Sequence, residues 1–544
     1  MVAFTFFAAC SRETGRNEAQ MPTNQEIELK FDAAPDVLQK LESEPPLLEA
    51  VRQGPKHLTT TYFDTPDHSL KSQSIFLRIR RANNHWLQSI KQGEGVERGE
   101  WEHQLECPVP SPELAEGTPV FHLLHKRKIA EALQAVFETD VERRSFIVEG
   151  GSTRIEVSVD QGAVKAQGKA LPISELELEL KEGDRSELFR LARLLCDRAP
   201  LVLSLIGKGE RGFLLAEGVW GCPQKRSNPH VGFDMTAAEA LVQICRIGLH
   251  DFMLNQPAFE LSPNDIEAVH QSRIAIRRLR AAMSFFQPIA RDWQFDGLRE
   301  DLKWISDLLG AARDLDVWLT DALPEKIREG QSETGLGEAG RDETGVAMLM
   351  KTMEDKRARA QACLNEALHS DRMRYLLFDF AIWLEQGDWR HEPAANERDA
   401  QILDFLGQNL LPKIQKVVKR GAQLAKMDPP AQHRFRIRAK KLRYTVELFE
   451  DLAVGRRAHK EFERLTGALD VIQTALGRIH DEAALSAYLT SEFCRSPEAG
   501  EQPSAAAAFA AGTLARGCGQ PKEVLRKAQR AHRDLSDRRP FWAI

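Results

Sequence analysis

The stretch EIELKF at residues 26–31 decides the fold expected for the first part of this 544-residue chain. Charged and apolar side chains alternate strictly along it. A β-strand would therefore place Glu26, Glu28 and Lys30 on one face and the three apolar residues on the other. Strict period-two alternation is typical of a strand with one apolar and one polar face. We expect a sheet whose polar face carries carboxylates beside a lysine.

The same alternation recurs in several later stretches. Residues 175–180 read ELELEL, residues 77–80 read LRIR, and residues 100–102 read EWE. Taken singly, each stretch would fit the solvated face of an ordinary one-sided antiparallel sheet. Because the pattern repeats along five strands, we predict instead an antiparallel barrel whose charged face lines the interior. Two helical patterns interrupt the strands, at about 120–137 and at 185–198.

Bulk properties indicate a multidomain globular protein, with 42% hydrophobic and 28% charged residues. Eight cysteines without a CxxC pair favour a reduced, cytoplasmic protein. No apolar run approaches the ~20 residues of a membrane span, so no membrane partner is expected. Four segments are predicted: an extension that is disordered or precedes the true start at 1–21, the barrel domain at 22–216, a Gly- and Pro-rich linker at 217–231, and an all-α domain at 232–540.

Acidic and basic rows on one interior face point to phosphate chemistry. Such an interior is costly unless ions fill it. Clustered carboxylates suit a hard divalent cation such as Mg²⁺, and rows of arginine and lysine suit the oxygens of a polyanion. Together the two rows are typical of phosphoryl transfer to water.

These motifs resemble the CYTH family, the triphosphate tunnel metalloenzymes, and the resemblance implies an eight-stranded antiparallel barrel that forms a tunnel. The resemblance runs in order through residues 22–216 and includes the ExExK start, YFDT at 62–65, LRIR at 77–80 and the acidic strand at 175–179. It implies catalytic residues Glu26, Glu28, Lys30, Glu100, Glu102 and Glu177. It implies metal ligands among Glu26, Glu28, Glu175, Glu177, Glu179 and Asp160, for Mg²⁺ or Mn²⁺. It implies triphosphate contacts from Lys30, Arg78, Arg80, Lys91, Arg143, Lys208 and Arg211.

Two details depart from a simple match. Relatives often carry a basic residue two positions after Arg143, where this chain has Ser145, with Arg144 beside it. Either neighbouring pair of the three glutamates at 175–179 fits the family pattern. A literal GxGxxG at 207–212 follows no parallel-strand pattern and opens no βαβ unit, so we predict no dinucleotide site there.

The second half of the chain repeats itself. The pattern HxxRxxxRRLR at 270–280 returns as HxxRxxxKKLR at 433–443, and LGxxRD at 309–314 returns as LGxxHD at 476–481. On a helix the spacing i, i+3, i+7, i+10 places the cations in one stripe, roughly an 80° arc. Like charges so spaced repel each other, which favours an anion as their partner. The alternative is pairing with Asp314, Asp316 or Asp481 of adjacent helices.

This half resembles the CHAD domain, the conserved-histidine α-helical domain. The resemblance implies two repeated four-helix bundles that bind inorganic polyphosphate. The implied contacts are His270, Arg273, Arg277, Arg280, His433, Arg436, Lys440 and Arg443. Metal binding by the two histidines is not predicted, since neither has a second histidine or cysteine at metal spacing.

The two resemblances together predict an enzyme that hydrolyses inorganic triphosphate to diphosphate and phosphate and binds polyphosphate, in the cytoplasm and at polyphosphate granules. Three alternatives stay open: a polyphosphate-binding adaptor with an inactive barrel, an adenylate cyclase, and an organic triphosphatase. The last two need a site for a base or another organic group, and no base-reading residues stand out. Few aromatic residues interleave the basic stripes, so nucleic acid is not expected.

Overall fold

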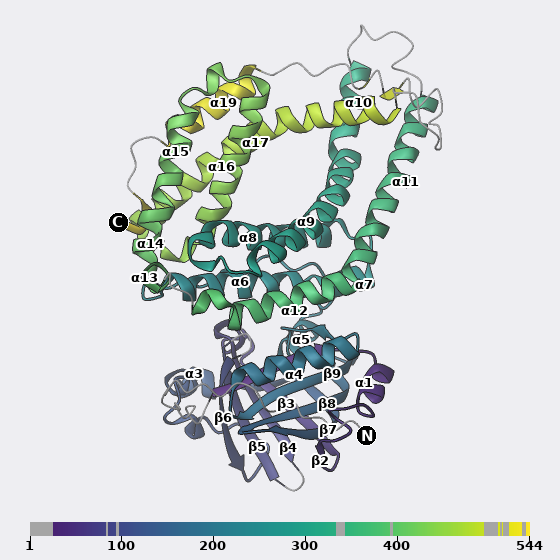
Figure 1. Ribbon diagram of the computed structural model, residues 1–544, viewed down its shortest axis with the longest axis vertical. Helices are drawn as coiled ribbons and strands as arrows, with labels where there is room; N and C mark the ends of the chain where they lie inside the picture. Colours follow the sequence, from purple (N-terminus) through teal and green to yellow (C-terminus); the bar gives the residue numbers. More distant parts are fainter. Residues whose placement is uncertain are drawn as a thin grey trace. The chain divides into compact units, whose positions relative to one another are not determined.

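The computed structural model describes residues 25–82, 85–93, 97–332, 343–391, 395–493, 510–511, 514, 522–535 and 540–543. The predicted extension at 1–21 lies outside the described residues. The chain divides into two compact units, Met1–Cys222 and Pro223–Ile544. The first is built mainly of strands and the second of helices (Figure 1).

Ten antiparallel strands form one sheet in the first unit. Their bounds are β1 Gln25–Asp32, β2 Val51–Arg52, β3 Lys56–Asp64, β4 Ile75–Ala82, β5 His85–Gln92, β6 Glu97–Leu105, β7 Gln134–Gly150, β8 Thr153–Ala166, β9 Lys169–Glu182 and β10 Val202–Leu203. The order across the sheet is β10-β1-β6-β5-β4-β3-β7-β8-β9, with β2 beside β7. The antiparallel pairing agrees with the prediction made from the alternation of apolar and polar residues.

The predicted eight-stranded closed barrel is wrong in strand number and in closure. The sheet has ten strands because the two-residue strands β2 and β10 add to the edges of β7 and β1. Strand β1 divides its pairing, with residues 25–27 on β6 and residues 28–32 on β9. Each neighbour therefore contacts only part of β1, and the wall is not a regularly closed barrel.

Helices accompany this sheet at a few points. Helix α4 (Arg185–Arg198) coincides with the helical pattern at 185–198, and Asp184 caps it by accepting a hydrogen bond from the Ser186 amide at 2.8 Å. Figure 1 shows α4 along the sheet beside β9. The helix predicted over 120–137 is wrong beyond the single turns α2 (Phe121–Leu124) and α3 (Arg127–Ala130). From Gln134 onward, pairing with both β3 and β8 holds the chain as β7.

The glycine-rich stretch at 207–212 opens helix α5 (Lys208–Ala216), which packs on β7 and β8. A Cβ added at Gly212 would lie 2.0 Å from the ring of Phe137. The glycine is therefore required for close contact between α5 and the sheet, where Tyr62, Phe137 and Phe213 form part of one apolar core. Packing of α5, rather than nucleotide binding, accounts for this motif.

The second unit is helical, as predicted. Its helices are α6 Ala237–Leu254, α7 Gln256–Leu261, α8 Ile266–Ala290, α9 Phe295–Val317, α10 Leu323–Ser332, α11 Glu343–Leu368, α12 Asp371–Gln386, α13 Ala395–Arg398, α14 Ile402–Asn409, α15 Leu411–Gly421, α16 Pro429–Glu447, α17 Arg456–Phe493 and α19 Lys522–Arg533. Helix α8 packs against α6, α9 and α16, and α16 also packs against α15 and α17. The division into two four-helix bundles stays a prediction. Among the described residues, no helix is both long and apolar enough to span a membrane.

Candidate functional site

On one face of the sheet, polar and charged residues of β1, β9 and β8 lie opposite one another in rows that cross the three strands. We call these rows rungs. In register, the rungs are Glu28 with Glu179 and Glu156, Lys30 with Glu177 and Ser158, and Asp32 with Glu175 and Asp160. Residues directly opposite each other on one face of an antiparallel sheet lie close enough to interact. Glu28 and Glu177 are each only 6% exposed, and Asp160 and Glu175 are 0% exposed. The face is therefore an enclosed interior rather than the solvated side of a one-sided sheet.

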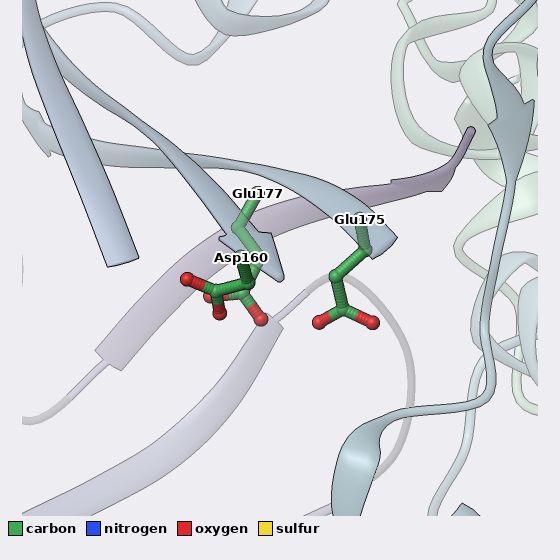
Figure 2. Close-up of side chains that lie close together, drawn as sticks. All are labelled: Asp160, Glu175 and Glu177. Carbon is green, nitrogen blue, oxygen red and sulfur yellow. The ribbon is translucent and has the colours of Figure 1, made fainter. Parts of the chain in front are cut away.

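Three of these carboxylates converge in one cluster. Asp160, Glu175 and Glu177 each bring an oxygen to within 4.8 Å of the others. Figure 2 shows their three side chains lying close together. Lys208 Nζ lies 2.6 Å from Asp160 Oδ2 and 2.9 Å from Glu177 Oε1, and it also contacts Glu175. One ammonium group thus binds all three carboxylates. The cluster is built to hold a cation, and here that cation is the side chain of Lys208.

The two glutamates of this cluster have pKa values shifted in opposite directions. Burial alone would raise the pKa of Glu177, but Lys208, Lys30 and Arg143 outweigh it and hold that pKa well below its ordinary value. Lys30 Nζ lies 2.6 Å from Glu177 Oε1, and Arg143 contacts the other oxygen. Burial raises the pKa of Glu175, and Lys208 offsets only part of this effect. Glu177 is therefore the strongly held anion of the pair.

A second acidic group consists of Glu28 and Glu179, which are in register, and of Glu26, which lies two residues before Glu28 on the same face of β1. Burial raises the pKa of Glu179 to about 7, the charge of Lys181 offsets only part of the shift, and Glu26 and Glu28 add to it. Lys181 Nζ lies 2.6 Å from Glu179 Oε1, and Lys91 Nζ lies 2.7 Å from Glu26 Oε2. Crowding among like charges persists despite these lysines. A divalent cation with oxygen ligands would relieve it.

Arginines from β4 and β7 form the basic counterpart. Arg78 and Arg143 each have a carboxylate partner, at 2.9 Å and 2.6 Å. Among the described residues Arg80 has no carboxylate within ion-pair distance, and its Nε donates to Thr60 Oγ1 at 3.4 Å. The charge of Arg78, then burial, then the charge of Arg143 lower the pKa of Arg80 to about 10. A guanidinium crowded by two others is a position where a bound anion would be stabilised.

Tyr62 belongs with these arginines, although sequence reasoning gave it no role in the site. It is paired in register with Arg78, and its ring stacks on Phe137 with centroids 4.4 Å apart. Burial would raise the pKa of its hydroxyl, but hydrogen bonding to Arg78 and the charges of Arg78 and Arg80 outweigh burial and lower that pKa. The sequence held no local signal for this role, because the register that sets Tyr62 opposite Arg78 follows only from the pairing of β3 with β4.

Residues of β5 and β6 connect the basic and acidic groups. Lys91 Nζ lies 3.2 Å from Glu100 Oε2, in addition to its contact with Glu26. Burial would raise the pKa of Glu100, but Lys91 and Arg78 outweigh it and lower that pKa. Glu102 lies two residues further along β6, on the same face as Glu100, and accepts a hydrogen bond from Ser89 Oγ at 2.7 Å. Glu100 therefore lies within the charged network, and Glu102 at its border.

Arg211 contacts protein groups on several sides. Its guanidinium lies 2.6 Å from Asp32 Oδ1 and donates to the Ile206 carbonyl at 3.1 Å and to Ser204 Oγ at 3.0 Å. It also lies 3.6 Å from Glu175 Oε2. These contacts hold α5 against β1. To bind triphosphate as predicted, Arg211 would have to give up some of them.

The departure at Ser145 leaves that position without a basic side chain. Ser145 Oγ lies 3.0 Å from Ser158 Oγ in a buried pair. Arg144 lies on the opposite face of β7, because neighbouring residues of a strand point to opposite sides. Its Nε donates to Glu42 Oε1 at 2.8 Å. Arg144 does not replace the basic residue that relatives carry.

In the second unit the two predicted basic stripes lie on α8 and α16, which contact each other. The Arg277 guanidinium lies 3.7 Å from the centre of the Tyr444 ring, and Arg443 and Lys440 lie 5.2 Å and 6.0 Å from it. One aromatic ring thus contacts cations from both helices. Tyr444 was not anticipated, although its place one residue after the second stripe is visible in the sequence.

Some cations of the second stripe form ion pairs with acidic residues, as the alternative interpretation of the sequence predicted. Arg436 lies 3.2 Å from Asp481, and Arg443 contacts Asp470 and lies 3.4 Å from Glu447. In the first stripe, Arg280 donates to Ser306 Oγ at 2.6 Å. Burial and then the charge of Arg313 lower the pKa of His270. His433 occupies the equivalent position on α16.

Four cations of the stripes have no carboxylate within ion-pair distance among the described residues: Arg273, Arg277, Arg280 and Lys440. Burial lowers the pKa of Arg277 to about 10, with Arg443 and Arg273 adding to the effect. Burial, then Arg273, Arg277 and Arg436, lower the pKa of Lys440 to about 8. Neighbouring cations add to the effect of burial at Arg277 and Lys440, so positive charge is crowded at the α8–α16 contact. An anion bound there would relieve it.

The repeated Leu-Gly motif has a packing role beside this charge. A Cβ at Gly310 would lie 2.7 Å from a terminal guanidinium nitrogen of Arg273. At the equivalent place in the second repeat, a Cβ at Gly477 would lie 3.5 Å from Arg436 Nε. In the first repeat the glycine therefore makes room for the arginine of the HxxR motif, whereas in the second an added Cβ would only be in ordinary van der Waals contact with it. The glycine and the arginine lie beside each other in both repeats.

Two family comparisons agree with this division. Residues 24–213 match the CYTH domain and residues 249–490 match the CHAD domain. The chain therefore consists of a CYTH domain followed by a CHAD domain, the first resemblance lying over the sheet and the second over the helices.

Among curated proteins, the chain is 32% identical over 197 residues to an inorganic triphosphatase of Haemophilus influenzae. That match covers 35% of this chain and 55% of the relative, little more than half of its length. An uncharacterised protein of Mycobacterium tuberculosis is 24% identical over 518 residues, covering 89% of this chain and 92% of that protein.

Two solved structures are similar at low sequence identity. The CHAD domain from the plant Ricinus communis is 24% identical with a TM-score of 0.46, covering 57% of this chain and 96% of that one. A putative adenylyl cyclase from Hippeastrum, described as having a dominant triphosphatase activity, is 16% identical with a TM-score of 0.27, covering 36% and 96%.

Proposed function

We propose that the first unit hydrolyses inorganic triphosphate to diphosphate and phosphate with the help of Mg²⁺ or Mn²⁺, and that the second unit binds inorganic polyphosphate. The domain limits proposed are those predicted from the sequence, 22–216 and 232–540, joined by 217–231. The observation that carries the first half is Arg80, a largely enclosed cation without a carboxylate partner that is crowded by Arg78 and Arg143. The triphosphatase relative over this same domain supports the choice of substrate.

Phosphate oxygens would be bound by the basic side of the interior. Arg80, Arg78 and Arg143 offer planar donors suited to pairs of phosphate oxygens. Lys30, Lys91 and the other predicted contact, Lys208, are held by carboxylates in this structure. A triphosphate entering the site would offer these ammonium groups an alternative anion. The lysines would then exchange carboxylate oxygens for phosphate oxygens without leaving the buried interior.

The acidic residues fit a divalent cation. Asp160, Glu175 and Glu177 bring their carboxylate oxygens together, and Glu26, Glu28 and Glu179 form a second acidic group beside them. We favour the second group, because Lys208 already neutralises the first, whereas burial, with the charges of Glu26 and Glu28 adding to it, raises the pKa of Glu179 to about 7. Glu177 lies between the two groups and could serve either. A cation bound there would polarise the terminal phosphate and neutralise its developing charge.

The protein's own residues would then position and enclose the reaction. Glu100 and Glu102 of β6 are proposed to orient the attacking water, since Glu100 stays ionised through its contacts with Lys91 and Arg78. Burial of the site limits competing water, which strengthens each charge interaction. Phosphoryl transfer of this kind depends chiefly on positioning and charge stabilisation.

Polyphosphate binding is proposed for the α8–α16 contact, where Arg273, Arg277 and Lys440 lack carboxylate partners within the described residues. A chain of phosphates would neutralise the stripes of both helices at once. The other predicted contacts, His270, Arg280, His433, Arg436 and Arg443, border the same contact. We place the protein in the cytoplasm, and at polyphosphate granules when such granules are present.

A comparison of phosphate release from different substrates tests the proposal. Phosphate release from the full chain should be fastest with inorganic triphosphate and slower with ATP or long-chain polyphosphate, and EDTA should abolish it. Cyclic AMP formation from ATP would favour the cyclase alternative. Polyphosphate binding without release from any substrate would favour the adaptor alternative.

A further inference from the structure

A second basic surface lies on the opposite face of α16 from the proposed polyphosphate stripe. It is a groove of about 620 Å³ between α15 and α16, and its cationic lining residues are Lys416, Lys419, Arg420, Arg434 and Arg438. On α16 the groove residues and the stripe residues are centred roughly 170° apart, at 100° per residue. The groove is therefore separate from the α8–α16 contact and belongs to no site described above.

The groove carries charge that the protein does not neutralise. No acidic residue lines it. None of its five cations forms an ion pair with a carboxylate within the described part of the chain. Lys416 and Arg420 stand four residues apart on α15, as do Arg434 and Arg438 on α16. Like charges at this spacing destabilise a helix slightly, so both helices bear a small cost that a bound anion would reverse.

The arrangement of the cations indicates an extended ligand. On α15 they occupy positions i, i+3 and i+4, and the lining continues past the end of the helix to Gln423. Seven residues of helix span roughly 10 Å. The α16 residues have the same spacing from Ala431 to Arg438. Two parallel rows of donors along one groove suit a linear polyanion rather than a single phosphate.

We propose that this α15–α16 groove binds a second segment of the inorganic polyphosphate chain, so that the helical unit holds one chain at two places. The proposal rests on polyphosphate binding at the α8–α16 contact. Nucleic acid fits the lining less well, because Phe435 is its sole aromatic residue and is only 1% exposed. A base would find no ring on which to stack.

Two-site binding makes a quantitative prediction. A chain held at both places gains from an effective local concentration, whereas a ligand too short to span them does not. Removing one site should lower the affinity for long-chain polyphosphate at least about tenfold. It should also reduce the salt dependence, since each lost phosphate contact reduces the slope of log K against log salt by about 0.7 for a flexible chain.

The test compares three variants of the full chain, in EDTA so that no hydrolysis occurs. The groove variant carries Lys419→Gln, Arg420→Gln and Arg434→Gln, all at exposed positions. The control variant removes three equally exposed cations of the same unit, Arg456→Gln, Arg457→Gln and Lys460→Gln. The stripe variant carries Arg273→Gln and Arg277→Gln. Affinity for long-chain polyphosphate and for single-stranded DNA is measured at several salt concentrations.

We expect the affinity of the groove variant for polyphosphate to fall at least about tenfold. The slope of its log K against log salt should decrease in magnitude by about two, and the control variant should be unchanged in both respects. If the groove variant binds like the control while the stripe variant loses affinity, the groove proposal is overturned and the proposed function stands. If the unmodified protein does not bind polyphosphate, both fail. If the groove variant loses only DNA binding, the occupant is nucleic acid and the proposal is wrong.

Discussion

Replacing Arg80 with glutamine should stabilise the first unit and weaken triphosphate binding at the same time. The pKa of Arg80 falls from 12.5 to about 10, chiefly through the charge of Arg78. At about 1.4 kcal/mol per pKa unit, its charged form is disfavoured by roughly 3 kcal/mol. Lost packing of the side chain offsets part of this gain. We expect the free energy of unfolding to rise by about 1–2 kcal/mol and the melting temperature by roughly 2–8 °C.

The same change should remove one charge-assisted contact with the substrate, worth about 1.5–3 kcal/mol, and raise KM roughly 10- to 100-fold. Arg81→Gln is the matched control, since Arg81 is the exposed neighbour on β4 and its guanidinium lies 5.8 Å from the Trp86 ring centre. Differential scanning calorimetry in phosphate-free buffer and initial rates of phosphate release give the two quantities. A lower melting temperature together with an unchanged KM would refute the assignment of Arg80 to the anion site.

Three further outcomes follow from the charges and packing described. With a pKa of about 7, Glu179 is mostly protonated below pH 7 and must lose its proton to bind metal. Mn²⁺ affinity should therefore rise up to about tenfold per pH unit below 7, and Glu179→Gln should flatten this dependence; an equally steep profile in the variant would contradict the account. With a pKa of about 8, Lys440 loses its charge as pH rises through 8, so polyphosphate affinity should fall there, and Lys440→Arg should bind equally well at pH 7 and 9. Gly310→Ala should displace the Arg273 side chain and weaken polyphosphate binding several-fold, whereas Gly297→Ala on the same helix, with nothing within 4 Å of its added Cβ, should not; equal binding by both variants would separate the glycine from the site.

Alternation along single strands was enough to predict which residues share the charged face. Glu28, Lys30 and Glu177 follow from period two alone, because a strand's side chains alternate regardless of its neighbours. Register between strands could not be predicted this way. The rung that sets Glu28 opposite Glu179, and so raises the pKa of Glu179, depends on how β1 divides its pairing between β6 and β9.

Contacts between distant segments were also beyond the sequence. Lys208 comes from α5, and nothing in its local pattern shows that it would reach Asp160 and Glu177 at once. The strand β7 was partly misread as a helix at 120–137, because pairing with strands on both sides overrides local propensity. In the second unit the repeat revealed the two stripes, but only their packing shows that Tyr444 contacts cations of both.

Metal-dependent phosphate release from inorganic triphosphate by the full chain, measured beside Glu28→Gln, tests the central claim most directly. Glu182→Gln is the matched control, because Glu182 ends the acidic strand β9 at an exposed position. The account predicts turnover that requires Mg²⁺ or Mn²⁺, is lost at least about a hundredfold in Glu28→Gln through removal of a metal ligand, and is unchanged in Glu182→Gln. Turnover that survives in Glu28→Gln, or that proceeds equally well in EDTA, would contradict it.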